Sequence, residues 1–283
     1  MTLIRQLYTH FQVLSIDVVL GCVVNTLLIA KYCNVIVPNT VLCALASATW
    51  LIYTADHLAD ATKLKEKASS DRHLFHFKYR KALIIFSFIL LIINILNLFY
   101  LPILIIKAGF YLSLGVLVYF FFLRLASGQP SLFKEISIAF IYAVAIFLAP
   151  AVLSTKIWNT ATYLLFVSYF LLALINLLEF SLFDLALDEK EQYSSLIRKL
   201  GKSKSKKVIG SLIYISFLWL MAGTIYLYYN DFTNFSFFHQ IQICLFFMNV
   251  VLATLLLFPS YFVKNNRYRV FGDMVFLFPV FLF

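Results

Sequence analysis

Long apolar stretches alternate with short polar segments along the whole chain. In windows of about 19 residues the pattern gives about nine apolar stretches, each near the roughly 20 residues that a helix needs to cross a bilayer. We expect the spans at residues 10–31, 38–60, 80–100, 102–123, 134–153, 160–184, 207–229, 238–260 and 268–283. The chain is therefore predicted to be an all-α polytopic membrane protein, with about nine transmembrane helices in a single domain, residues 1–283.

Composition supports the same class. The chain is 63% hydrophobic and 13% charged, with a mean hydropathy of +0.91, whereas about a quarter of the residues in a soluble globular domain are charged. The first apolar stretch is long and lacks a small-residue cleavage site, so we expect it to remain in the mature protein. The sequence contains no GxxxxGK, HExxH, GxSxG or Rossmann glycine pattern. Nucleotide-driven transport, zinc proteolysis and serine hydrolysis therefore find no support.

The distribution of positive charge predicts the orientation. With nine spans and a cytosolic N-terminus, 20 of the 23 Lys and Arg residues fall on the cytosolic side, and only Lys31, Lys107 and Lys156 do not. Positive residues are retained on the cytosolic side of membrane proteins, where they also meet anionic lipid headgroups. We therefore explain the net charge of +10 by membrane lipids and expect no nucleic-acid partner. The expected location is the plasma (inner) membrane of a bacterium.

Two acidic pairs stand at the ends of apolar spans. Asp56 and Asp60 end the second span, and Asp184 and Asp188 end the sixth. On a helix, residues four apart share one face, and carboxylates at membrane depth are kept where they meet a cation. Mg²⁺ is usually held by one or two carboxylates together with substrate phosphates. The four aspartates therefore predict a Mg²⁺–diphosphate site, with simple pairing to loop Lys and Arg as the structural alternative.

Basic and aromatic residues at the same level complete this hypothesis. The basic candidates for contacts to the diphosphate oxygens are Arg72, Arg124, Lys134 and Arg198. If the substrate carries an isoprenoid tail, cleavage of its allylic C–O bond leaves a carbocation that aromatic faces stabilise. The 31 Phe and 17 Tyr residues suit that role, although lipid-facing bulk explains them as well.

Polar residues inside the spans have both functional and structural explanations. Glu179 lies within the sixth span, where an ionisable residue marks a functional site by default, but an interhelical hydrogen bond explains it equally well. Asn176 is the weaker substrate-binding candidate and fits an interhelical contact. Asp17 and Asn25 are two turns apart in the first span and either line a cavity or join helices. Asp273, in the last span, is expected to be structural.

The two longest predicted loops, residues 61–79 and 185–206, each follow an acidic pair. Residues 71–81 interleave bases with aromatics, as at a membrane interface, and we expect His73 and His76 there to meet solvent or lipid headgroups. Residues 194–200 predict a short helix that stops at Gly201.

Several segments resemble the UbiA-type intramembrane prenyltransferases. The matching segments are residues 53–60 (YTADHLAD), 181–188 (SLFDLALD), 195–201 (SLIRKLG) and the region from Tyr119 through Arg124 to Lys134. The resemblance implies a nine-helix bundle around a central cavity and a Mg²⁺-bound prenyl diphosphate that alkylates a lipophilic acceptor. The family's first motif begins with Asn and Asp, where this chain has Ile52 and Tyr53, so the chain resembles a diverged member.

Two other classes remain open. A multi-pass transporter or ion-coupled carrier would use the intramembrane carboxylates to bind a cation or a substrate. A glycine or proline in mid-span would favour it, whereas Pro38, Pro102 and Pro150 lie near span ends. A non-catalytic membrane scaffold would tolerate replacement of all four aspartates.

Overall fold

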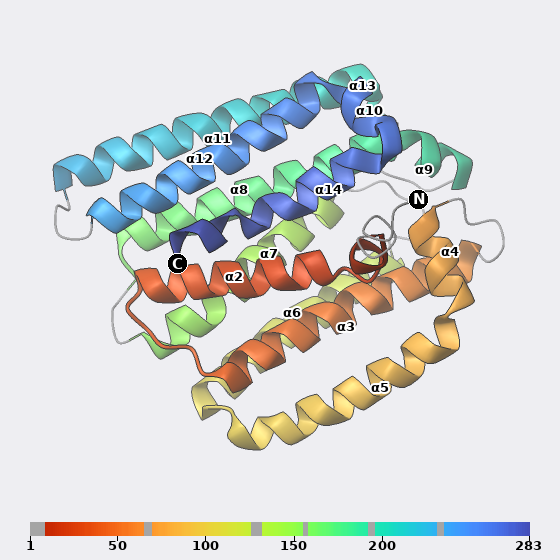
Figure 1. Cartoon of the computed structure of the whole chain (residues 1–283), viewed down its shortest axis with the longest axis horizontal. Coiled ribbons are helices and arrows are strands. Elements are labelled where there is room, and N and C mark those ends of the chain that lie inside the picture. Colours follow the sequence, from red (N-terminus) through yellow and green to blue (C-terminus); the bar gives the residue numbers. More distant parts are fainter. Residues whose placement is uncertain (1–8, 65–69, 126–131, 155–157, 192–195, 231–234) are drawn as a thin grey trace.

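The computed structural model describes residues 9–64, 70–125, 132–154, 158–191, 196–230 and 235–283. Among these residues 92% are helical and none forms a strand. Figure 1 shows the helices lying side by side, most of them along one common direction. The all-α prediction is therefore confirmed.

Seven helices within the described ranges are long and apolar enough to cross a membrane. They are α3 (Asn39–Leu64), α5 (Arg80–Asn97), α6 (Ile103–Leu125), α7 (Leu132–Leu153), α8 (Thr160–Phe183), α11 (Lys202–Asn230) and α12 (Phe235–Leu257). They coincide with seven of the nine predicted spans. The protein is thus a polytopic integral membrane protein, because apolar helices of this length match the hydrocarbon core of a bilayer.

The first and last predicted spans are not continuous long helices. Helix α2 (Ile16–Tyr32) has 17 residues, because the chain breaks at Ser15, whose φ is 55°. Helix α14 (Arg267–Met274) passes into the 3₁₀ segment η4 (Val275–Leu282). The predicted count of nine transmembrane helices is therefore not confirmed. Serine rarely adopts this left-handed conformation, and no glycine or proline marked the break in the sequence.

Short helices gather at one end of the bundle. Helices α4 (Asp71–Lys78), α9 (Leu185–Glu191), α10 (Leu196–Leu200) and α13 (Pro259–Val263) lie on the right in Figure 1. The glycine stop is confirmed: Gly201 has φ 78°, and its N–H donates to the Ile197 carbonyl at 2.9 Å. Helix α4 begins at Ser70, whose side chain accepts the His73 N–H at 3.2 Å.

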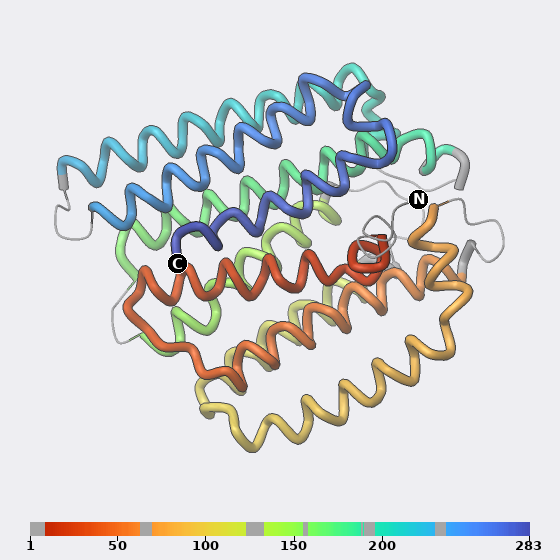
Figure 2. Tube along the Cα trace, viewed as in Figure 1, coloured from red at the N-terminus to blue at the C-terminus, as the bar shows by residue number. Residues whose placement is uncertain are grey.

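Helix α8 lies at the centre of the protein core. Leu165, Leu172 and Ile175 on this helix are completely buried, and α7, α11, α12 and α14 pack around it. Helix α5, by contrast, buries only Leu83 and exposes most of its other large apolar side chains. The tube in Figure 2 shows α5 at the periphery, as expected for a helix that faces lipid.

Candidate functional site

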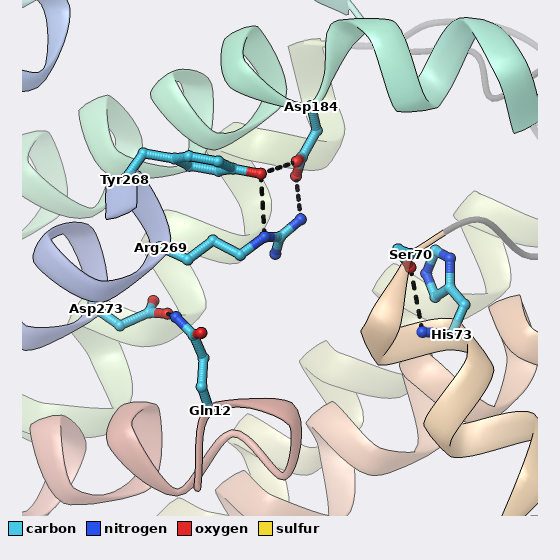
Figure 3. A network of polar contacts seen from close by, with 7 residues as sticks. All are labelled: Gln12, Ser70, His73, Asp184, Tyr268, Arg269 and Asp273. Atoms are coloured by element: carbon cyan, nitrogen blue, oxygen red, sulfur yellow. Dashed lines mark hydrogen bonds and ion pairs between the residues drawn. The ribbon is translucent and has the colours of Figure 1, made fainter. Parts of the chain in front are cut away.

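Helix α14 binds the acidic end of α8. The Arg269 Nη2 lies 2.6 Å from the Asp184 Oδ2, and the Tyr268 hydroxyl donates to the Asp184 Oδ1. The Arg269 Nε also donates to the Tyr268 hydroxyl, at 3.1 Å. Figure 3 shows these three side chains closing a ring of contacts. A guanidinium and a hydroxyl thus neutralise and orient one of the four predicted metal-binding carboxylates.

Tight packing fixes α14 in this place. The Tyr268 ring stacks on Phe183 with the centroids 4.8 Å apart. A Cβ added to Gly272 would lie only 2.4 Å from the Phe180 ring and 2.8 Å from the Asn176 Oδ1. Only glycine allows this approach of α14 to α8 without a shift of its neighbours. Gly272 is therefore the residue that lets Arg269 reach Asp184.

A second pair of acids lies on the other side of Arg269. Asp273 accepts a hydrogen bond from the Gln12 Nε2 at 3.5 Å and lies within electrostatic reach of Asp17. Both aspartates are buried, and the Asp17 Oδ1 accepts the Val18 N–H at 2.9 Å. Asp273, which we expected to be purely structural, therefore lies beside the candidate site.

Arg72 of α4 connects the two acidic helix ends. It lies within electrostatic reach of Asp184 and Asp273 and also of Asp56 on α3. Burial and the positive charge of Arg269 lower the pKa of Arg72. An arginine in this position requires compensating negative charge, which acids from several helices supply.

The first acidic pair has the predicted geometry. Helix α3 runs unbroken through Asp56 and Asp60, so the two residues share a helical face one turn apart. Both residues are half-buried, and Lys134 at the start of α7 lies within electrostatic reach of Asp56. Arg72 and Lys134, both predicted phosphate contacts, therefore lie near the first pair.

The second pair differs from the prediction. Helix α8 ends at Phe183 and α9 begins at Leu185, so Asp184 stands at a break and Asp188 lies on the next helix. The side chains of Asp188 and Arg124 lie outside the described residues. Arg198 is exposed on α10. Asp184 and Asp188 have the expected spacing of four residues, but they do not lie on one continuous helix.

Two polar residues of α8 are buried with side-chain oxygens that have no partner in the described part of the chain. Glu179 is 0% exposed, and neither carboxylate oxygen has a hydrogen-bond partner among the described residues. The Asn176 Oδ1 likewise lacks a partner within the described part of the chain. Neither residue takes part in the contacts around Asp184, so their predicted role in substrate binding stays a prediction.

The expected solvation of His76 is wrong. His76 is 1% exposed, and its Nδ1 lies 2.9 Å from the Arg72 carbonyl oxygen. Its ring meets the His57 ring at 5.1 Å between centroids, and the His57 Nε2 lies 3.4 Å from the Ser15 Oγ. Burial lowers the pKa of His76. The two histidines hold α4 against α3, because rings packed this closely exclude water.

Asn25 joins helices, as one of its two interpretations expected. Its Nδ2 donates to the Phe276 carbonyl at 2.8 Å and to the Gly21 carbonyl at 2.6 Å. This contact holds η4 against α2.

Reasoning from the sequence missed Tyr268 and Arg269, which it had counted only as aromatic bulk and cytosolic charge. The signal in the sequence was their position after Asn265 and Asn266, at the start of the last predicted span.

A metal ion would not find a complete ligand set among the described side chains. No group of three His, Cys, Asp or Glu side chains in the described ranges could hold one. No family model, curated protein or solved structure matches this chain. Any function must therefore be argued from the geometry of this end of the bundle.

Proposed function

We propose that the protein is an intramembrane prenyltransferase, which transfers an isoprenyl group from a Mg²⁺-bound prenyl diphosphate to a lipophilic acceptor. The observation that carries the proposal is the environment of Arg72. This half-buried arginine lies within electrostatic reach of Asp56 near the end of α3 and of Asp184 at the end of α8. One cation under the influence of two acidic motifs far apart in the sequence supports a shared diphosphate site.

The donor set fits Mg²⁺ only if a substrate completes it. Asp56, Asp60, Asp184 and Asp188 would hold the ion through oxygens, which Mg²⁺ prefers, and the diphosphate would supply further ligands. The ion, when bound, would offset the charge that develops on the leaving diphosphate.

The chain's own residues would then orient and stabilise the donor. Arg72 and Lys134 lie within electrostatic reach of Asp56 and are proposed contacts to phosphate oxygens, together with Arg124 and Arg198. In the reaction the C–O bond to the diphosphate breaks and a bond forms from the prenyl carbon to the acceptor. The acceptor loses a proton, and the diphosphate leaves. Glu179 and Asn176 are proposed to contact the acceptor within the bundle.

Orientation forms part of the proposal. We assign the N-terminus and the end of the bundle with α4, α9 and α10 to the cytosolic face of a bacterial plasma membrane. The positive-inside pattern of the sequence supports this orientation. The prenyl donor and the lipophilic acceptor would reach the site from the surrounding membrane lipids.

Single Asp→Ala variants at positions 56, 60, 184 and 188 test the proposal. We expect each to lose most of the Mg²⁺-dependent release of diphosphate from labelled prenyl donors, in detergent or nanodiscs. Arg267→Ala is a suitable control, because Arg267 packs on the Tyr261 ring at 4.3 Å and contributes to no part of the proposed site. Full turnover by all four aspartate variants would rule the activity out.

An ion-coupled carrier is the second candidate function, and one observation favours it. Asp17 and Asp273 are buried carboxyl groups in electrostatic contact, an arrangement found in proton relays of transporters. The break at Ser15 also interrupts the first predicted span, as broken helices do in carriers. Solute flux into liposomes without any prenylated product would favour the carrier over the enzyme.

A further inference from the structure

The Asp184 carboxylate already has a cation. Its Oδ2 is paired with the Arg269 Nη2 at 2.6 Å, and its Oδ1 accepts from Tyr268. Only 17% of the Arg269 side chain and 18% of the Asp184 side chain are exposed, so water screens this pair little. A metal ion that used Asp184 would have to compete with the guanidinium for the same negative charge.

Arg269 is well placed to give up that partner. It lies within electrostatic reach of Asp273 and of the half-buried Arg72. Figure 3 shows it between Asp184 and Asp273, with His73 of α4 across from it. Two guanidinium groups within electrostatic reach of each other repel, and an anion between them relieves that repulsion. An anionic ligand bound between α4 and α14 would therefore attract both Arg72 and Arg269.

We propose that Arg269 is an exchangeable counter-ion of Asp184 and a binding residue for the donor. In the ligand-free protein Arg269 neutralises Asp184, and when Asp184 takes up Mg²⁺ the guanidinium moves to the diphosphate oxygens. The exchange keeps the charge of the site balanced. Mg²⁺ replaces the Arg269 guanidinium at Asp184, and the released guanidinium pairs with the diphosphate. This inference rests on the proposed function and adds to it a residue that its motifs do not contain.

The exchange makes two reciprocal predictions. Arg269→Gln removes the competitor, so metal should bind about tenfold more tightly without donor, while diphosphate should bind about tenfold more weakly, because one charge-assisted hydrogen bond is lost. Asp184→Asn releases Arg269, so inorganic diphosphate should bind about tenfold more tightly in the absence of metal. A merely structural ion pair predicts neither gain in affinity.

The experiment measures binding rather than turnover. The full-length protein in nanodiscs is titrated with Mn²⁺ in place of Mg²⁺, followed by the electron paramagnetic resonance of free Mn²⁺. Inorganic diphosphate is titrated separately by calorimetry without metal. Arg267→Gln is the matched control, because it removes the same charge from the same helix at a side chain that packs on Tyr261. We expect it to change both affinities by less than about twofold, as for a charge outside the site.

The outcomes separate this inference from the proposed function. If the wild-type protein binds Mn²⁺ and diphosphate but Arg269→Gln binds Mn²⁺ no more tightly, the exchange is refuted and the proposed function stands. If the wild-type protein binds neither ligand, alone or in the presence of the other, both fail. If the Arg269→Gln variant does not fold, the Asp184→Asn variant alone tests the exchange. Unchanged or weaker diphosphate binding by Asp184→Asn would then overturn it.

Discussion

The two acidic helix ends share a spacing but differ in their surroundings. Helix α3 carries Asp56 and Asp60 on one continuous face, half-buried and near Lys134. Helix α8 stops at Asp184, which α14 holds by an ion pair and a hydroxyl contact. The two acidic pairs therefore share a sequence spacing but have different partners in the ligand-free protein. A metal would meet competition from a bonded guanidinium at Asp184, whereas no such contact is described at Asp56.

The largest effect is expected when one aspartate of either acidic pair is replaced. Asp56→Asn and Asp184→Asn should each lower prenyl-transfer turnover about 100-fold or more, because each removes charge that positions the leaving group. Their stabilities should differ: Asp184→Asn leaves Arg269 without its anion and should lower the free energy of unfolding by about 2 kcal/mol. Thermal unfolding in detergent measures this, and equal stability of the two variants would contradict the comparison.

The next substitution is expected to disturb only the packing of α14 against the end of α8. In Gly272→Ala the new Cβ would meet Phe180 at 2.4 Å, so α14 must shift at a cost of about 1–3 kcal/mol. The control is Gly210→Ala, where the nearest atom is 3.8 Å away and the helix should gain rather than lose stability. Unfolding temperatures of the two variants test this. A stable Gly272→Ala protein would mean that α14 is not held tightly against α8.

A smaller effect isolates the hydroxyl contact. Tyr268→Phe keeps the ring that stacks on Phe183 but removes the donor to Asp184, so we expect a loss of about 1 kcal/mol. Tyr261→Phe, on the exposed side of this region, is the control. In the Asp184→Ala background, which lacks the acceptor, Tyr268→Phe should cost less, because only the hydrogen bond from the Arg269 Nε remains to be lost, and a double-mutant cycle measures the difference.

The smallest expected effect concerns α4, which joins the two ends. Burial lowers the pKa of His76 below its ordinary value of 6.5, so the unfolded chain takes up this proton first as the pH falls. The stability that neutral His76 contributes is therefore present above about pH 6.5 and is lost as the pH drops below that value. His76→Gln should lose less thermal stability between about pH 7.5 and 5.5 than the wild-type protein. An equal loss would show that His76 does not titrate in this range.

Much of the fold could be predicted from the sequence, because membrane spans are recognised by their length and hydropathy. Seven of the nine predicted spans are long apolar helices, and the stop at Gly201 follows from the left-handed conformation that glycine tolerates. The breaks at Ser15 and Asp184 could not be predicted, because neither residue prevents a helix from continuing. His76 was misjudged because the segment around it, residues 71–81, is rich in basic residues typical of a membrane interface, whereas its neighbours in space include His57.

The order of residues by itself determined an all-α membrane protein with carboxylates at two helix ends, since bilayer thickness and the cost of buried charge act on any chain of this composition. Only the tertiary structure decided which charges meet. Arg72 and Arg269 come from segments nearly 200 positions apart, yet Arg269 pairs with Asp184 and Arg72 lies within electrostatic reach of it. Electrostatic pairing depends on distance in space, and the packing of Gly272 against α8 sets that distance.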